Sequence, residues 1–178
     1  MTEGGYDSTL DTMRHSRRVD QLLLQIISAL QDRVTRHDLS KMEPPEKAVF
    51  DRITPSLKAS TYGSEEYKRS LADMGEILVH HYGANRHHPE HYADGIAGMT
   101  LVDVIEMLAD WKAATERHDD GSLARSLTIQ EERFGIEPQL MSILLNTAVA
   151  FGWLPPVGDV DDQAGAVAGA VQPEDPEG

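Results

Sequence analysis

The sequence predicts an all-α protein, a helical bundle of about six to seven helices. Apolar side chains recur every three or four residues in several segments, which is the period of an amphipathic helix. Capping residues and acidic first turns precede some of these segments. No run of residues alternates between apolar and polar as a half-buried β-strand would. A chain of 178 residues, of which 40% are apolar, suits one folded domain, which we place at residues 1–155.

The first half of the chain predicts three helices. The first spans residues 9–34, where the aliphatic side chains at helical spacing are Val19, Leu22, Leu23, Ile26, Ile27 and Leu30. A short helix over 45–53 begins at Pro45, which suits a first helical turn. The segment TPSLKASTYGS that follows is predicted to be a loop. A third helix spans 64–82, with Ser64 as its cap.

The second half predicts three more helices and a tail. Thr100 caps a helix over residues 101–118, and Asp103 stands three positions on, as in a capping box. Shorter helices are predicted over 122–133 and 137–152. Residues 156–178 are rich in Gly, Ala, Pro and acids without any helical or strand period, so we expect a disordered acidic tail.

Composition excludes several classes of function. The net charge of −14 makes the chain a poor binder of DNA or RNA, although a small phosphorylated ligand can still bind in a local basic pocket. There is no cysteine, which rules out disulfides and thiolate metal sites and is compatible with a reducing cytosol. No apolar run reaches the ~20 residues of a membrane span. The N-terminus does not resemble a signal peptide, so we expect a cytoplasmic protein without membrane contact.

Five of the eight histidines lie in one fifteen-residue stretch, LVHHYGANRHHPEHY, at positions 78–92. His81 continues the apolar stripe of its helix, whereas His80 is rotated away from it and suits the negative C-terminal end of that helix. The loop that follows carries Asn85, Arg86, His87 and His88. These side chains can bind a metal or a phosphate, or supply a general acid, since an imidazole has a pKa near ~6.5. We expect His91 and His118 to be surface residues.

Two further histidines lie on or near the first predicted helix. His15 stands four positions before Val19 and therefore on the apolar face, where it is either a core histidine or a metal ligand. His37 and Asp38 can chelate one ion if the backbone presents both side chains to the same side; otherwise Asp38 is a helix cap. Lys41 lies one turn later. A metal pair beside a cation is what a phosphate ester requires.

Acidic side chains line one face of the helix predicted over 101–118. Asp103, Glu106 and Asp110 stand at i, i+3 and i+7, on the border of an apolar stripe. We place Leu101, Val104, Ile105, Leu108 and Trp111 in that stripe. The acids form either a solvated face or carboxylates that point into a cleft.

Along the chain these residues stand in the order His15, His37-Asp38, the histidine cluster and Asp103. This order resembles the motif order of the HD-domain superfamily of metal-dependent phosphohydrolases, over roughly residues 10–120. RHSRRV, residues 14–19, resembles the signature of that family's first helix. HDLSK, residues 37–41, resembles its HD-x-x-K variant, which is typical of members with additional histidines and two metals. The chain also resembles an uncharacterised family of phage and bacterial proteins with segments similar to NRHHPEH and DVIEMLADWKAA.

The resemblance implies an HD-like bundle with one or two divalent ions, of Mn, Co, Fe, Zn or Mg. It implies His15, His37, Asp38 and Asp103 as ligands of the first ion, with Asp110 as the alternative to Asp103. His81 and either His87 or His88 would hold a second ion. In the family the extra histidines are usually far apart in the chain, whereas six residues separate His81 from His87 here.

The resulting hypothesis is hydrolysis of a phosphate ester, most plausibly a nucleotide or deoxynucleotide by similarity to nucleotidase and dNTPase members. Lys41, Arg86, His87 and His88 would be the catalytic side chains, and Arg14 or Arg18 would also hold phosphate oxygens. The glycine-rich signature of cyclic-dinucleotide phosphodiesterases is missing from the sequence. The resemblance also implies a homo-oligomer.

Two other hypotheses remain open from the sequence. The first is a di-iron oxygenase, because some HD-fold proteins with four histidines and two aspartates hold two irons. The second is a module without catalysis, in which the metal is structural or the domain binds a nucleotide as an adaptor.

Overall fold

The structure is a computed structural model, and it describes residues 6–61 and 64–156. Over these residues the chain forms seven α-helices and three short 3₁₀ helices, with no β-strand. The predicted all-α class is confirmed. The chain divides into two compact units, Met1–Gly121 and Ser122–Gly178. The predicted domain at 1–155 is not tested by this division, and nearly all of the predicted tail lies outside the described residues.

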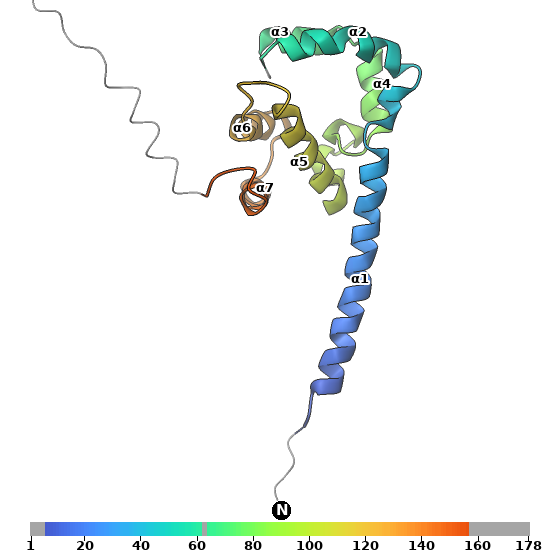
Figure 1. The fold of residues 1–178 in the computed structure, drawn as a ribbon, viewed down its shortest axis with the longest axis vertical. Helices are drawn as coiled ribbons and strands as arrows, with labels where there is room; N and C mark the ends of the chain where they lie inside the picture. The colour runs from blue at the N-terminus through green and yellow to red at the C-terminus, as the bar shows by residue number, and fades with distance from the viewer. Residues whose placement is uncertain (1–5, 62–63, 157–178) are drawn as a thin grey trace, which may run out of the picture. The chain divides into compact units, whose positions relative to one another are not determined.

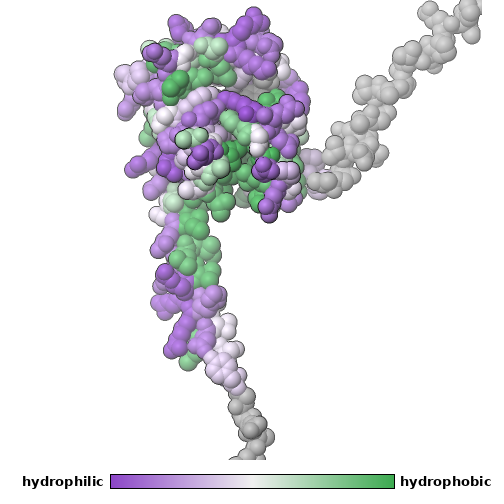
Figure 2. Space-filling view, turned by 180° about the vertical axis from the view of Figure 1, so that it is seen from behind, coloured by the Kyte–Doolittle hydropathy of each residue, from purple (hydrophilic) through white to green (hydrophobic). Residues whose placement is uncertain are grey.

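The first unit begins with a long helix, α1 (Thr9–Arg36), which ends two residues after its predicted boundary. None of its residues is buried. Only its C-terminal end contacts α5 (Leu101–Thr115), where Arg33 of α1 pairs with Asp103. The apolar face over Val19–Ile27 is exposed, and it forms the green strip along the helix in Figure 2. The apolar pattern therefore predicted the helix correctly but did not place its face in a core.

After α1 come a short 3₁₀ helix, η1 (Leu39–Met42), and α2 (Glu46–Ala59). The predicted loop after residue 53 is wrong, because α2 continues through Pro55 to Ala59. A proline inside a helix removes one backbone hydrogen bond to the residue four positions earlier. That residue, Asp51, is exposed, so water can satisfy its carbonyl oxygen and the helix continues.

The helix predicted over 64–82 is two helices, α3 (Glu65–Ala72) and α4 (Glu76–Ala84). The chain turns between them at Gly75, which has a φ of 52° and a ψ of −127°. Only glycine adopts such a conformation readily. The predicted cap of α3 is confirmed, because Ser64 Oγ accepts a hydrogen bond from the backbone N–H of Tyr67 at 3.1 Å.

Two short 3₁₀ helices, η2 (Pro89–His91) and η3 (Gly95–Gly98), connect α4 to α5. The capping box at the start of α5 is confirmed, since the side chains of Thr100 and Asp103 each bond the other's backbone N–H. The buried apolar residues of α5 are Val104, Met107, Leu108 and Trp111. Leu101 and Ile105, which we expected in this stripe, are exposed. Met107 instead is fully buried.

The second unit contains α6 (Leu123–Phe134) and α7 (Pro138–Ala150). Both agree with the predicted ranges to within two residues. Ser122 caps α6, and Gly135 ends it in the left-handed conformation, with a φ of 59°. Among the described residues, none of the helices has both the length and the apolar character needed to cross a membrane.

Candidate metal centre

Three segments of the first unit bring imidazoles and carboxylates together. They are the end of α1 with the start of η1, the C-terminal part of α4 with the loop after it, and one face of α5. In Figure 1 the upper end of α1 lies beside α4 and α5. The residues whose ligand atoms meet there are His37, Asp38, His81, His87, His88 and Asp110.

The backbone at the end of α1 presents His37 and Asp38 to the same side. Asp38 has a φ of 58°, in the left-handed region, and is the only described residue other than glycine with a positive φ. This conformation often ends a helix, and Asp tolerates it better than most residues. The chain therefore turns sharply after α1, so that both side chains reach the cluster. The pair lies between two helices, because His37 directly follows α1 and Asp38 directly precedes η1.

The Nε2 atoms of four imidazoles point into the cluster. His81 Nε2 lies 2.9 Å from His88 Nε2 and 3.4 Å from Asp38 Oδ1. His87 Nε2 lies 3.6 Å from the same oxygen. His37 Nε2 lies 3.5 Å from both Asp38 Oδ2 and Asp110 Oδ1.

Two glutamates hold the opposite nitrogens of three of these rings. Glu106 Oε1 lies 3.0 Å from His37 Nδ1 and 3.2 Å from His87 Nδ1. Glu46 Oε2 lies 2.9 Å from His81 Nδ1, and Glu46 is fully buried. A carboxylate at Nδ1 fixes the hydrogen there and leaves the lone pair on Nε2, which is the arrangement around metal-binding histidines in proteins.

Two buried atoms at the centre have no hydrogen-bond partner. They are Asp38 Oδ1 and His87 Nε2, the pair separated by 3.6 Å. Buried polar atoms are usually hydrogen-bonded, because an unpaired one costs about 1–3 kcal/mol. Both atoms are electron-pair donors aimed at a common space, so a cation bound between them would remove this cost.

The distances fit a metal ion. Two ligands at roughly 2.1 Å from one ion, at angles of 90° to 120°, lie roughly 3.0–3.6 Å apart. The ligand atoms of Asp38, His81, His87 and His88 all lie within 4.8 Å of one another, as do those of His37, His87 and Asp110. His87 belongs to both groups, and its single Nε2 lone pair can bind only one ion. The donor set of imidazole and carboxylate suits Mn, Fe, Co or Zn.

The electrostatics keep the ligands in their metal-binding forms. Burial, together with the neighbouring His87 and His81, lowers the pKa of His88 to about 2, so that its ring is neutral. Burial alone would raise the pKa of Asp110, but a hydrogen bond with His37 lowers it to about 2. In the same way His37 and His87 lower the pKa of Glu106 to about 2 against the effect of burial.

The pKa of His37 shifts in the opposite direction to that of His88. Hydrogen bonds with Asp110 and Glu106 raise the pKa of His37 to about 10. The ring is thus a cation between carboxylates when no other cation is near. A metal ion would take the place of that proton at Nε2.

The residues of the cluster are exposed to solvent to different degrees. The side chains of His37 and Lys41 are 32% and 27% exposed, whereas those of His81 and His87 are each 2% exposed. Lys41 Nζ lies 2.5 Å from Asp38 Oδ2. The accessible side of the cluster is therefore the one that carries His37 and Lys41.

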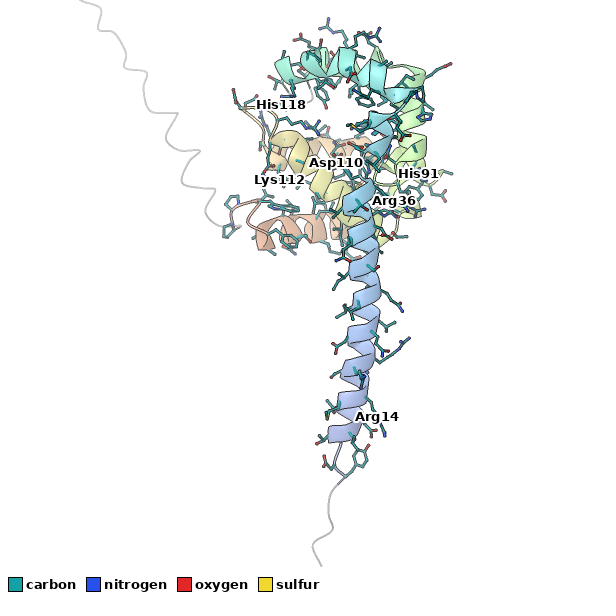
Figure 3. All side chains as sticks on the ribbon, turned by 45° about the vertical axis from the view of Figure 1, so that its right-hand side comes forward. Arg14, Arg36, His91, Asp110, Lys112 and His118 are labelled. Carbon is teal, nitrogen blue, oxygen red and sulfur yellow. The ribbon has the colours of Figure 1, made fainter. Side chains whose placement is uncertain are left out.

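Two expected ligands do not belong to this cluster. His15 is exposed on α1, 22 residues from His37, which is ~33 Å along a helix. Figure 3 labels its neighbour Arg14 near the N-terminal end of α1 and Asp110 beside the other end. Asp103 is buried but bound by Arg33 Nη2 at 2.8 Å and by Arg86. We therefore correct the preference for Asp103 in favour of its alternative, Asp110.

The predicted phosphate-binding arginines also lie elsewhere. Arg86 donates to both carboxylate oxygens of Asp103, at 3.2 and 3.1 Å. Arg14 and Arg18 lie on the exposed part of α1. His91, which we expected at the surface, is half-buried and bonds the carbonyl of Tyr82, and His118 is half-buried.

Sequence reasoning missed the role of both glutamates. Glu106 was recognised on the acidic face of α5, but not as the partner of two imidazoles. Glu46 was not singled out at all, although it bonds His80, His81 and Ser40. Nothing local marks Glu46, because its partners lie up to 35 residues away in the chain.

Comparison with known proteins gives one match. Residues 5–150 match the family of unknown function DUF5662. The chain belongs to this family. No curated protein and no solved structure matches the chain. The match includes every residue of the cluster, but the family has no assigned activity, so the function must be argued from the site.

Proposed function

We propose that the chain is a metal-dependent hydrolase of phosphate esters. The observation that carries this proposal is the pair of unpartnered buried donors, Asp38 Oδ1 and His87 Nε2, among further imidazole nitrogens and carboxylates. His37, His81, His88 and Asp110 complete the set. The resemblance of HDLSK to the HD-x-x-K motif supports the same reading.

A divalent ion bound by these residues would act as a Lewis acid toward a phosphate oxygen and would lower the pKa of a bound water. The protein's own contribution begins with the two glutamates. Glu106 and Glu46 orient three of the imidazoles, and a site whose ligands are already oriented requires no rearrangement when it binds an ion.

Lys41 is the cation beside the cluster. Its ammonium group is partly exposed on the accessible side and lies against Asp38 Oδ2. An ammonium group at this place can hold a phosphate oxygen and balance the negative charge of the substrate. Arg86 does not share this role, because its guanidinium binds Asp103.

His87 and His88 are better supported as ligands than as general acids. His87 is 2% exposed and its Nε2 points to Asp38. The low pKa of His88, about 2, makes it a poor proton donor at neutral pH. The substrate class, a nucleotide or deoxynucleotide, follows from the resemblance to the HD-domain superfamily.

A di-iron oxygenase is the second candidate. The observation that favours it is the donor count, four imidazoles and two aspartates in two overlapping groups. Such a set suits iron as well as manganese or zinc. Iron content and oxygen consumption distinguish this candidate from hydrolysis.

The experiment is metal analysis of untagged protein by elemental mass spectrometry, combined with phosphate release from a panel of nucleotides in Mn²⁺, Co²⁺ and Mg²⁺. We expect one or two ions per chain. His88→Ala and Asp110→Asn should lower metal content and abolish phosphate release. His15→Ala is the matched control, since its ring is exposed and far from the cluster, and it should keep both.

The outcomes separate the alternatives. Bound iron with oxygen consumption and no phosphate release supports the oxygenase. Bound metal with neither activity supports a structural metal or a binding module. Metal content that depends on His15 but not on His88 would contradict the ligand set drawn from the structure.

A further inference from the structure

The largest unexplained surface of the first unit is the apolar face of α1. Five aliphatic side chains on it are between 38% and 51% exposed: Val19, Leu22, Leu23, Ile26 and Ile27. Together they leave on the order of 400 Å² of apolar surface in water, a size at which a patch is usually functional. Figure 2 shows this strip as continuous green along the helix.

The metal centre does not require this face. All proposed ligands and the two glutamates lie between His37 and Asp110. Nothing in the centre explains why α1 continues for more than five turns before His37, or why its exposed side is aliphatic. An amphipathic helix usually buries such a face against another part of a protein.

The amino-acid composition of the strip indicates what kind of surface its partner presents. Residues 21–31, QLLLQIISALQ, contain no charged side chain. The cores of protein interfaces are depleted in charge, because a buried unpaired charge is costly. The partner surface must therefore also be aliphatic and uncharged where it meets this strip.

The strip is complementary to itself when two copies run antiparallel. Its aliphatic residues are placed symmetrically about the midpoint between Leu24 and Gln25. Leu22 would stand opposite Ile27, and Leu23 opposite Ile26. Val19 would stand opposite Leu30, which follows the strip on the same face of the helix and is half-buried. A twofold interface requires this kind of self-complementarity, in which each contact occurs twice.

We propose that the apolar strip of α1 binds the same strip of a second copy of this chain, antiparallel about the Leu24–Gln25 midpoint. The surface of two such strips is on the order of 800 Å², below the ~1,200 Å² of a stable specific interface. We therefore expect a weak, reversible dimer. This assignment is independent of the proposed activity.

The first test is sedimentation velocity of the full chain from low to high micromolar concentration. We expect a concentration-dependent shift from one to two chain masses. Leu23→Glu places a charge in the strip and should leave only monomer. Leu24→Glu is the matched control, because Leu24 is 62% exposed and lies on the other side of the helix. It should dimerise like the wild type, and circular dichroism should show that both variants remain helical.

The second test uses the absence of cysteine from the chain. Val19→Cys and Leu30→Cys are made separately, mixed and oxidised. The antiparallel register predicts a disulfide-linked dimer in the mixture and little in either variant alone. Efficient linkage of Val19→Cys to itself would contradict the register, since two copies of that residue would lie ~16 Å apart along the helix axes.

Two other results would overturn the proposal. If the wild type is monomeric at every concentration, no second copy covers the strip. If Leu23→Glu lowers the melting temperature without changing a monomeric mass, another part of the same chain covers it instead. Metal content is unchanged in either case, so these failures are distinguishable from failure of the proposed function.

Discussion

Replacing Glu106 by Gln should weaken metal binding about 100-fold while the six ligands remain. Glu106 Oε1 contacts His37 Nδ1 at 3.0 Å and His87 Nδ1 at 3.2 Å. A glutamine keeps the shape but loses the charge, and its single oxygen cannot hold both ring hydrogens as strongly. Loss of one such partner typically costs about 10–100-fold in metal affinity. Because two imidazoles depend on Glu106, we expect a loss of affinity at the upper end of this range, about 100-fold. This loss corresponds to about 2.7 kcal/mol of binding free energy.

The assay is a competition titration of metal-free protein with a chelating dye, using Mn²⁺, Co²⁺ and Zn²⁺ in turn. The gain in melting temperature on adding metal gives a second readout. With metal in excess, a 100-fold weaker affinity removes about 2.7 kcal/mol of the stabilisation by ligand. The gain in melting temperature should therefore shrink in the variant.

Glu116→Gln is the control on the same helix, since Glu116 pairs only with Lys112 among the salt bridges and is well exposed. Its metal affinity should equal that of the wild type. An affinity of Glu106→Gln within twofold of the wild type would refute the reasoning, because the imidazoles would then not depend on this carboxylate for their orientation.

Three further predictions concern single substitutions. Lys41→Met should keep the metal but lower phosphate release about 100-fold, as measured with saturating metal, if its ammonium group holds the substrate. Asp103→Asn should lower the free energy of unfolding by about 2–4 kcal/mol in urea titrations, because it unpairs Arg33 and Arg86. Burial would raise the pKa of Asp103, but hydrogen bonds from Arg86 and Thr100 hold it well below the unfolded value of ~3.9. The stabilisation that the ionised Asp103 gives to the folded state is complete above about pH 4 and is lost as the pH falls below that value. The free energy of unfolding of Asp103→Asn should therefore decrease less at acidic pH than that of the wild type. Gly121→Ala should lower the melting temperature, since a Cβ there would lie 1.8 Å from the carbonyl oxygen of Thr115.

Most of the helices could be predicted because their signals are local. Ser64, Thr100 and Ser122 cap helices where the sequence placed helix starts. The errors have local causes as well. Gly75 divides one predicted helix, and a single glycine in an apolar pattern does not reveal whether its φ will be positive. Pro55 did not end α2, because the carbonyl that it leaves without a partner belongs to an exposed residue.

The cluster of imidazoles and carboxylates could be predicted only in part. The sequence indicated His37, Asp38, His81, His87 and His88, because they stand in dense motifs. It favoured Asp103 over Asp110, although the two residues lie seven positions apart and thus on one face of the same helix, where the pattern alone does not separate them. The choice depends on Arg33 and Arg86, which contact Asp103 from distant parts of the chain.

The position of His15 shows that the order of motifs in a sequence does not determine which of them meet in space. A first histidine and a later His-Asp pair meet in one site only if the chain folds back between them. Here α1 is continuous from Thr9 to Arg36, and no glycine or proline interrupts residues 9–36. A continuous helix holds His15 and His37 far apart, whatever their motifs resemble. The cluster is instead completed by His81 from α4 and by His87 and His88 from the loop after it. The part of α1 before His37 therefore contributes no ligand, and its uncharged aliphatic stretch at residues 21–31 is the surface that we propose binds a second copy of the chain.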